Sequence, residues 1–246
     1  MNELVSIIMP TFNSEMFVAR SIQSVLNQTY YQWEFLITDD KSTDNTIQII
    51  ESFSDSRIKL FQLDKNSGAA VARNESIRNM SGDLICFLDS DDEWIPTKLY
   101  DQILFMSNNN IRFSFTSYFR VEPDASFRIN KVGGKINYKQ LLGNTKIYTS
   151  TVMIRVFEGF PLMPNYRRRQ DFAYWLDLLK IIDYAYPLSV PLTKYYVTPN
   201  SLSSNYMKSV KSTWFIYRNH EELNFLVSGT HLLSYLFFAF KKRSNL

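Results

Sequence analysis

Cysteine is almost absent from this chain of 246 residues, which holds Cys86 alone, inside an apolar run. A single thiol cannot form a disulfide within the chain, so the sequence favours a reducing compartment. Glycine is also scarce, and no segment matches GxxxxGK[ST] or places GxGxxG after a predicted strand. Glycine-rich phosphate loops are therefore excluded, and any phosphate must be held mainly by metal and basic side chains.

Strong charge and long apolar runs are missing too. The net charge of +3 comes from 27 basic and 24 acidic residues, which is too mild to predict a nucleic-acid partner. The densest apolar run, Leu232 to Phe240, is about half of the roughly 20 residues that span a bilayer. The first residues carry neither a basic n-region nor a signal cleavage site, so we expect a cytoplasmic protein.

Histidine is limited to His220 and His231, which lie in the last part of the chain and away from every motif. We expect neither to belong to a metal or catalytic cluster. No internal repeat, low-complexity segment or linker divides the chain. We therefore treat residues 1–205 as one unit and residues 206–246 as a helical, apolar tail.

The first 88 residues alternate short β-branched runs with helical patterns, which predicts βαβ units and a parallel sheet. Four strands are expected, at Val5–Met9, Trp33–Ile37, Ile58–Leu63 and Leu84–Leu88. The intervening helices are expected over about Glu15–Gln28, around Ile47–Phe53, and from Ala69 to a glycine stop at Gly82. Farther on, a helix from Pro96, strands within 111–122 and 149–156, and a helix at Gln170–Ile182 predict a mixed extension of the sheet.

An acidic segment, Asp89 to Glu93, follows the fourth predicted strand directly and carries four carboxylates. Polar loops also follow the first and second strands, and ligands of open α/β sheets bind at this carboxyl edge. Crowded carboxylates repel one another unless a cation neutralises them, and oxygen ligands on a loop suit Mn2+ or Mg2+. Such ions usually share their ligands with substrate phosphates. A calcium loop is disfavoured, because Trp94 and Tyr100 occupy its glycine and glutamate positions.

Five segments together resemble family 2 glycosyltransferases of the GT-A fold: VSIIMPTFN, DDKSTDNT, NSGAAVARN, DLICFLDSDD and RRRQDFAYW. The resemblance runs from Val5 to about Tyr184. It implies a Rossmann-like, mixed and mainly parallel sheet flanked by helices, with a nucleotide-binding half at about 1–95 and an acceptor half at about 96–205. It also implies transfer of a sugar from a nucleotide diphosphate sugar, usually a UDP-sugar, with inversion at the anomeric carbon.

Carried over to this sequence, the resemblance assigns nucleotide-sugar contacts to Pro10, Thr11, Asn13, Asp40, Gly68, Arg73, Asp89 and Ser90. Pro10 and Thr11 would face the base and ribose, and Asp40 would accept a hydrogen bond from uracil. Asp89 and Asp91 match the DxD pair, whose second carboxylate reaches the metal. Asp92 is expected to cap the following turn instead.

Asp171 matches the acidic position of the family's ED motif, whose carboxylate is the general base that activates the acceptor hydroxyl. The residue before it departs from the motif, because Gln170 replaces a glutamate and removes a charge beside the base. Inversion needs one base opposite the leaving group, and one carboxylate suffices. Arg167 to Arg169 precede the base directly and could attract a phosphate-bearing acceptor.

Single-domain bacterial enzymes that extend lipid-linked O-antigen or capsule repeat units are similar in size and motifs. The resemblance thus implies a glycan acceptor on undecaprenyl diphosphate, at the cytoplasmic face of the inner membrane. Two other functions stay open: a non-catalytic GT-A-like binding or scaffold protein, and a sugar-1-phosphate nucleotidyltransferase. The second is disfavoured because MPTFNSEMF lacks the glycine-rich, basic loop of that class.

The tail from Leu223 to Leu246 combines aromatic and aliphatic residues with Lys241, Lys242 and Arg243. This composition suits a helix lying at an anionic membrane surface. The same residues could instead pack on the catalytic domain as an ordinary C-terminal helix. We expect peripheral membrane contact, because a lipid-linked acceptor stays in the membrane.

Overall fold

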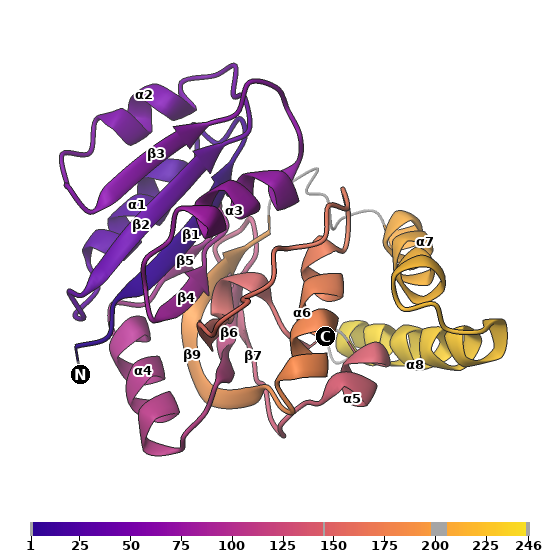
Figure 1. Ribbon diagram of the computed structural model, residues 1–246. Helices are drawn as coiled ribbons and strands as arrows, with labels where there is room; N and C mark the ends of the chain where they lie inside the picture. Colours follow the sequence, from indigo (N-terminus) through magenta and orange to yellow (C-terminus); the bar gives the residue numbers. More distant parts are fainter. Residues whose placement is uncertain (1, 145, 198–205, 245–246) are drawn as a thin grey trace.

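The computed structural model describes residues 2–144, 146–197 and 206–244. A nine-stranded mixed sheet runs through the molecule (Figure 1). Its strands are β1 Val5–Thr11, β2 Trp33–Asp39, β3 Ile58–Gln62, β4 Leu84–Phe87, β5 Glu93–Trp94, β6 Phe113–Val121, β7 Phe127–Asn130, β8 Met153–Arg155 and β9 Tyr186–Tyr196. The expected mixed α/β sheet is thus confirmed.

The strand order is β3-β2-β1-β4-β8-β6-β9-β5, and β7 pairs with the outer part of β6. The first four strands are parallel to one another, so their carboxyl ends meet at one edge. Beyond β4 the sheet becomes mixed, because β8 is antiparallel to both β4 and β6. The expected parallel half and mixed extension therefore share one continuous sheet.

Helices cover both faces of the sheet. They are α1 Val18–Leu26, α2 Thr46–Glu51, α3 Ala69–Arg78, α4 Lys98–Asn108, α5 Tyr138–Leu142, α6 Gln170–Ile181, α7 Tyr206–Phe215 and α8 Phe225–Ser244, with a short turn of 3-10 helix at Thr149–Thr151 and of π-helix at Ile216–His220. Alternation along β1 sends Ile8 into the core shared with α6, and Ile7 and Met9 into the core shared with α1 and α4. This double burial explains why the central strands are apolar on both faces.

Two sequence expectations about chain breaks were wrong. Pro10 lies within β1, which was expected to end at Met9, and it is tolerated there because β4 pairs with β1 only as far as Ile8. Gly82 does not end α3, which stops at Arg78 with Asn79 as its cap. A Cβ at Gly82 would lie 2.6 Å from the backbone nitrogen of Ser6, so glycine is needed for close approach to β1.

The last helices lie on the side of α6 that faces away from the sheet (Figure 1). Polar contacts attach them: His220 Nε2 is 3.0 Å from Asp177 Oδ1, and Lys180 Nζ is 2.9 Å from Glu221 Oε1. The expected unit boundary at residue 205 lies outside the described residues. Within the described residues, none of the helices has the length and apolar character needed to cross a bilayer.

Candidate active site

The loops after β1, β2 and β4 meet at the carboxyl edge of the parallel strands, as expected. Asn13 Oδ1 accepts a hydrogen bond from the Thr43 backbone N–H at 2.9 Å, which ties the first loop to the second. The Ser14 and Ser90 hydroxyl oxygens are 2.8 Å apart, which ties the first loop to the acidic segment. Asn13 adopts a left-handed φ of 47°, a conformation that asparagine tolerates well.

Asp40 is 3% exposed and organises the loop that precedes α3. Its two carboxylate oxygens accept hydrogen bonds from the backbone N–H groups of Ser67, at 2.6 Å, and Gly68, at 2.8 Å. Gly68 has a φ of 96°, which only glycine adopts without strain. The neighbouring Asp39 accepts a hydrogen bond from the Thr11 hydroxyl at 3.0 Å. The two aspartates therefore hold in place the segments that carry the predicted nucleotide contacts.

Arg73 and Asp89, both predicted to lie near the nucleotide, form an ion pair. The Arg73 Nη2 to Asp89 Oδ1 distance is 2.5 Å, and the side chains are 5% and 26% exposed. Arg73 is therefore not a solvated helical arginine, because it projects from α3 into the acidic segment. The pair neutralises one of the four crowded carboxylates.

Asp92 is fully buried and does not cap the following turn, in contrast to the expectation. Its Oδ2 accepts a 2.6 Å hydrogen bond from the Tyr148 hydroxyl and a second from the Ser150 hydroxyl. Burial, together with the nearby charges of Asp91 and Asp89, raises the pKa of Asp92 well above its usual range. Burial thus favours the neutral form of Asp92, which lessens the repulsion among the carboxylates.

Glu93 is neutralised by partners on β9, away from the other carboxylates. Burial opposes ionisation, but hydrogen bonds from Lys194, at 2.8 Å, and Tyr196, at 2.7 Å, lower the pKa of Glu93. Arg20 stacks 3.5 Å from the centre of the Tyr196 ring and donates to the Asp91 carbonyl at 2.8 Å. These contacts hold the acidic segment against α1 and β9.

The donor set of the acidic segment fits a hard divalent cation. Asp89 and Asp91 are partly exposed carboxylates on one loop, and Oδ1 of the buried Asp92 has no hydrogen-bond partner among the described residues. Oxygen-only ligands in small number are what Mg2+ and Mn2+ take when substrate phosphates complete the shell. Asp91, with Asp89, would hold such an ion.

A second acidic cluster was not foreseen. Asp177, His220 and Glu221 place one ligand atom each within 4.8 Å of the others. The sequence analysis expected His220 to belong to no metal or catalytic cluster. Lys180 Nζ lies 3.1 Å from Asp177 and 2.9 Å from Glu221. Because this ammonium group already neutralises the carboxylates, the cluster joins the tail to α6 without needing a metal.

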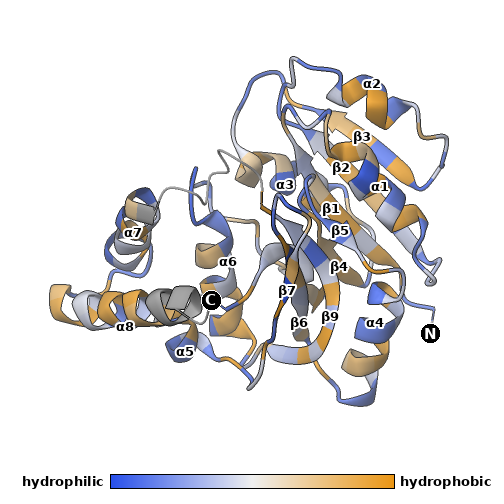
Figure 2. Cartoon of the chain, turned by 180° about the vertical axis from the view of Figure 1, so that it is seen from behind, coloured by the Kyte–Doolittle hydropathy of each residue, from blue (hydrophilic) through white to orange (hydrophobic). Residues whose placement is uncertain are grey.

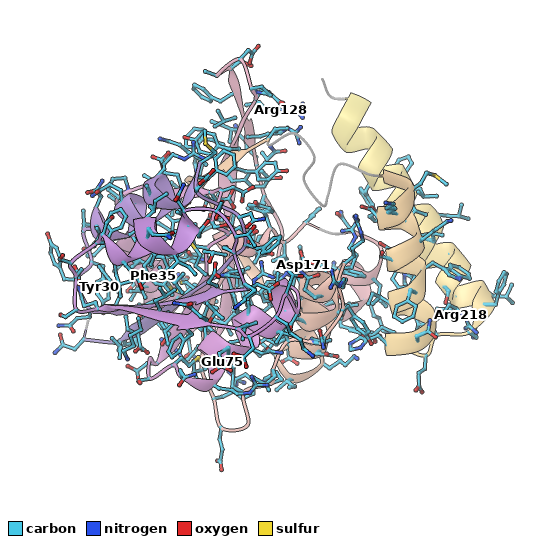
Figure 3. The ribbon with its side chains drawn as sticks, turned by 90° about the horizontal axis from the view of Figure 1, so that it is seen from above. Tyr30, Phe35, Glu75, Arg128, Asp171 and Arg218 are labelled. Atoms are coloured by element: carbon cyan, nitrogen blue, oxygen red, sulfur yellow. The ribbon has the colours of Figure 1, made fainter. Side chains whose placement is uncertain are left out.

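Asp171 lies in the first turn of α6, between the sheet and the tail helices (Figure 3). Its Oδ2 is 3.3 Å from the Thr149 hydroxyl, which donates to it. Arg169, which caps the helix, has a left-handed φ of 60° and donates to the Tyr235 hydroxyl at 2.5 Å. The amide oxygen of Gln170 is buried and has no partner among the described residues. The left-handed backbone of Arg169 is strained, and strained backbone is concentrated at functional sites.

The segment from Tyr148 to Thr151 is the part of the site that the sequence analysis missed. It was taken for the start of a strand, yet it forms a 3-10 turn whose side chains contact both Asp92 and Asp171. Its run of hydroxyl-bearing residues, YTST, was the available signal.

The fold and the carboxylates at the carboxyl edge of its parallel strands define a glycosyltransferase of the GT-A class. The chain belongs to glycosyl transferase family 2, whose model matches residues 6–160. The resemblance stated from the sequence is confirmed.

Two of its relatives are bacterial proteins of nearly the same length. TuaG of Bacillus subtilis (strain 168), named as a glycosyltransferase of teichuronic acid biosynthesis, is 41% identical over 98% of this chain and 97% of its own. WfgD of Escherichia coli, named UDP-Glc:alpha-D-GlcNAc-diphosphoundecaprenol beta-1,3-glucosyltransferase, is 39% identical over 98% of this chain and 95% of its own. These relationships favour a sugar transferase over a nucleotidyltransferase.

The structure is similar to TarS of S. aureus, solved with UDP-GlcNAc. The TM-score is 0.73 at 19% identity, covering 94% of this chain and 71% of that one. It is also similar to the mannosyltransferase PcManGT of Pyrobaculum calidifontis, solved with GDP-Man and Mn2+, with a TM-score of 0.61 at 16% identity over 82% of this chain and 59% of that one. Both likenesses concern the fold.

Proposed function

We propose that the protein is a metal-dependent inverting glycosyltransferase that moves a hexose or N-acetylhexosamine from a UDP-sugar to a hydroxyl of a lipid-diphosphate-linked glycan. One observation carries the proposal. Asp92 of the acidic segment and Asp171 at the start of α6 contact the same short turn, through Tyr148 and Thr149. This shared contact supports a metal-diphosphate site and a base that lie within one compact region.

In this mechanism Asp171 takes the proton of the acceptor hydroxyl. The acceptor oxygen forms a bond to the anomeric carbon while the bond from that carbon to the UDP oxygen breaks, and the electron pair leaves on the diphosphate. Mn2+ or Mg2+, when bound by Asp91 and Asp89, would stabilise the charge on the diphosphate. No second carboxylate is needed as a nucleophile, unlike in retaining enzymes.

The UDP assignment is supported by two relatives of different kinds. WfgD carries UDP-Glc in its name, and the similarly folded TarS was solved with UDP-GlcNAc. The nucleotide would lie against Pro10, Thr11 and Asn13. Asp40 and Gly68 would line the adjacent side of the nucleotide site. Asp40 already accepts two backbone N–H bonds, so a uracil contact would use the remaining lone pairs of its carboxylate.

The acceptor assignment is supported by the arginines before α6. Arg167 is exposed, and Arg169 is bonded to Tyr235 on α8. A lipid diphosphate held near these cations would place its sugar beside Asp171. The name of WfgD includes a diphosphoundecaprenol acceptor.

A lipid-linked acceptor places the enzyme at the cytoplasmic face of the inner membrane. The tail helix α8 supports peripheral attachment, because it packs on the protein along one face and exposes apolar residues along another. Tyr235 is 5% exposed, whereas Leu233 and Phe237 are 68% and 63% exposed. Figure 2 shows these apolar stretches along α8.

Titration of the purified protein with UDP, with and without Mn2+, tests the proposal. Metal-enhanced binding is expected, followed by transfer in a screen of nucleotide sugars with a lipid-diphosphate-linked acceptor. The competing scaffold function would give binding without transfer from any donor. Absence of UDP binding in either condition would contradict the proposed function.

A further inference from the structure

Between the two halves of the site lies the turn from Tyr148 to Thr151, here called the hydroxyl turn. Tyr148 is half-buried, and Thr149, Ser150 and Thr151 are at most 3% exposed. Its backbone closes on itself, since the Thr151 N–H donates to the Tyr148 carbonyl at 3.0 Å and the Thr151 hydroxyl to the same carbonyl at 2.6 Å. The turn is therefore a compact unit with little freedom of its own.

On one side the hydroxyl turn holds the acidic segment. The Ser150 hydroxyl accepts from the Asp89 backbone N–H at 3.1 Å and donates to Asp92. The Tyr148 hydroxyl donates to the same carboxyl group. These bonds fix the loop that carries the predicted metal ligands.

On the other side the turn reaches the base through one hydrogen bond. The Thr149 hydroxyl donates to Asp171 Oδ2. This bond holds one of the two oxygens of the carboxylate. Because Thr149 is 3% exposed, water has little access to its hydroxyl group.

Core side chains also hold the turn in place through hydrogen bonds. Trp94 Nε1 donates to the Ser150 carbonyl at 2.8 Å, and Gln102 Nε2 donates to the Thr151 carbonyl at 3.0 Å. Both donors are buried, so the turn is anchored to the β5 and α4 side of the sheet. A rigid support of this kind is what a positioning group requires.

We propose that Thr149 is a positioning residue for the base, orienting the Asp171 carboxylate relative to the acidic segment through the hydroxyl turn. The inference rests on the proposed function, because it assumes that Asp171 accepts the acceptor proton. Thr149 itself touches no reacting atom. A misplaced base costs rate without weakening donor binding, since the nucleotide contacts lie on other loops.

Thr149→Val, which replaces the hydroxyl with a methyl group of similar size, is the direct test. We expect kcat to fall about 10- to 100-fold while the Kd for UDP with Mn2+ changes less than about 2-fold. Thr149→Ser keeps the donor and should recover kcat to within about 3-fold. The matched control is Thr213→Val, a buried threonine of α7 whose hydroxyl bonds to the Ser209 carbonyl, and it should leave kcat unchanged.

A double-mutant cycle separates this inference from the proposed function. If Thr149 acts through Asp171, Thr149→Val should have no further effect on the residual rate of Asp171→Asn. Near-normal turnover of Asp171→Asn would overturn the base assignment in the proposed function. Loss of activity in Asp171→Asn, combined with wild-type kcat in Thr149→Val or failure of serine to rescue it, would overturn the role of Thr149 alone.

Discussion

Arg73 on α3 and Asp89 at the end of β4 are joined by a 2.5 Å ion pair in which the arginine is 5% exposed. The guanidinium group has little access to bulk water, so its charge is balanced mainly by this carboxylate. Arg73 also lies 4.0 Å from the Met163 sulfur, in the segment that leads to α6. The pair thus links the nucleotide half of the sheet to the approach of the catalytic helix.

We predict that Arg73→Met weakens UDP binding by about 10- to 100-fold, the range for losing one hydrogen bond to a charged group. The reason is that Asp89 loses the partner that orients it toward the nucleotide. Calorimetric titration with UDP and Mn2+ measures the effect. Arg78→Met on the same helix is the control, because its pair with Glu75 is exposed; equal affinities for both variants would contradict the prediction.

We predict that Asp171→Asn lowers kcat by about 100-fold or more, the scale for removing a general base. Asparagine keeps the size of the side chain but cannot take the acceptor proton, so donor affinity should stay nearly constant. Steady-state transfer assays and UDP titration separate the two quantities. Asp177→Asn, on the same helix beside His220, is the control and should retain most of the turnover.

We predict that Asp91→Ala weakens metal-dependent donor binding and that excess chelator abolishes transfer by the wild-type protein. Arg20 fixes the backbone of Asp91 by donating a 2.8 Å hydrogen bond to its carbonyl. UDP titration at several Mn2+ concentrations is the measurement, with Asp124→Ala at an exposed turn as the control. Full activity in chelator would rule out the metal requirement.

The parallel half of the fold could be predicted because its apolar runs have clear periods and end in polar loops. The family resemblance assigned Asp40, Arg73 and Asp89 to the site, and the contacts bring the segments that carry them together. The hydroxyl turn could not be predicted, since its role depends on partners 56 and 22 residues away in the chain. The burial of Asp92 could not be predicted for the same reason, because neighbouring carboxylates differ only in the contacts that they make in the folded chain.

Lys98 on α4 is fully buried, and burial lowers its pKa below the usual 10.5. Its ammonium group donates to Gln102 at 3.0 Å, and Gln102 in turn supports the hydroxyl turn. Between the lowered pKa and 10.5 the unfolded chain binds more protons than the folded one, so stability rises as pH rises through this window.

We therefore predict that the unfolding free energy of the wild type rises, relative to that of Lys98→Met, as the pH is raised toward 10.5, because Lys98→Met has no proton to release at this position. Urea denaturation at a series of pH values measures the difference. Lys139→Met, an exposed lysine on α5, should keep the wild-type slope. Parallel pH dependence of the wild type and Lys98→Met would contradict a buried, titrating lysine.

The tail helix presents two different faces, and the membrane prediction concerns only the exposed one. Tyr235 and Ser234 contact Arg169 and Gly143, so truncating the helix would also disturb the approach to Asp171. Substituting Leu233 and Phe237, which are 68% and 63% exposed, leaves those contacts in place. Point changes on the exposed face therefore test membrane contact without disturbing the catalytic half.

We predict that the wild-type protein sediments with anionic liposomes at low salt and that a Leu233→Ser, Phe237→Ser variant binds them at least about 10-fold more weakly, because apolar insertion and electrostatic attraction act together. UDP affinity should be unchanged. The control variant replaces Tyr31 and Tyr100, which are 72% and 43% exposed, with serine. Tyr100 lies on α4, which is on the far side of the sheet from α8 (Figure 1), and Tyr31 lies between α1 and β2. Equal liposome binding by the two double variants would assign the membrane contact to another surface, and a wild-type protein that stays in the supernatant would show that the exposed face of α8 has a different role.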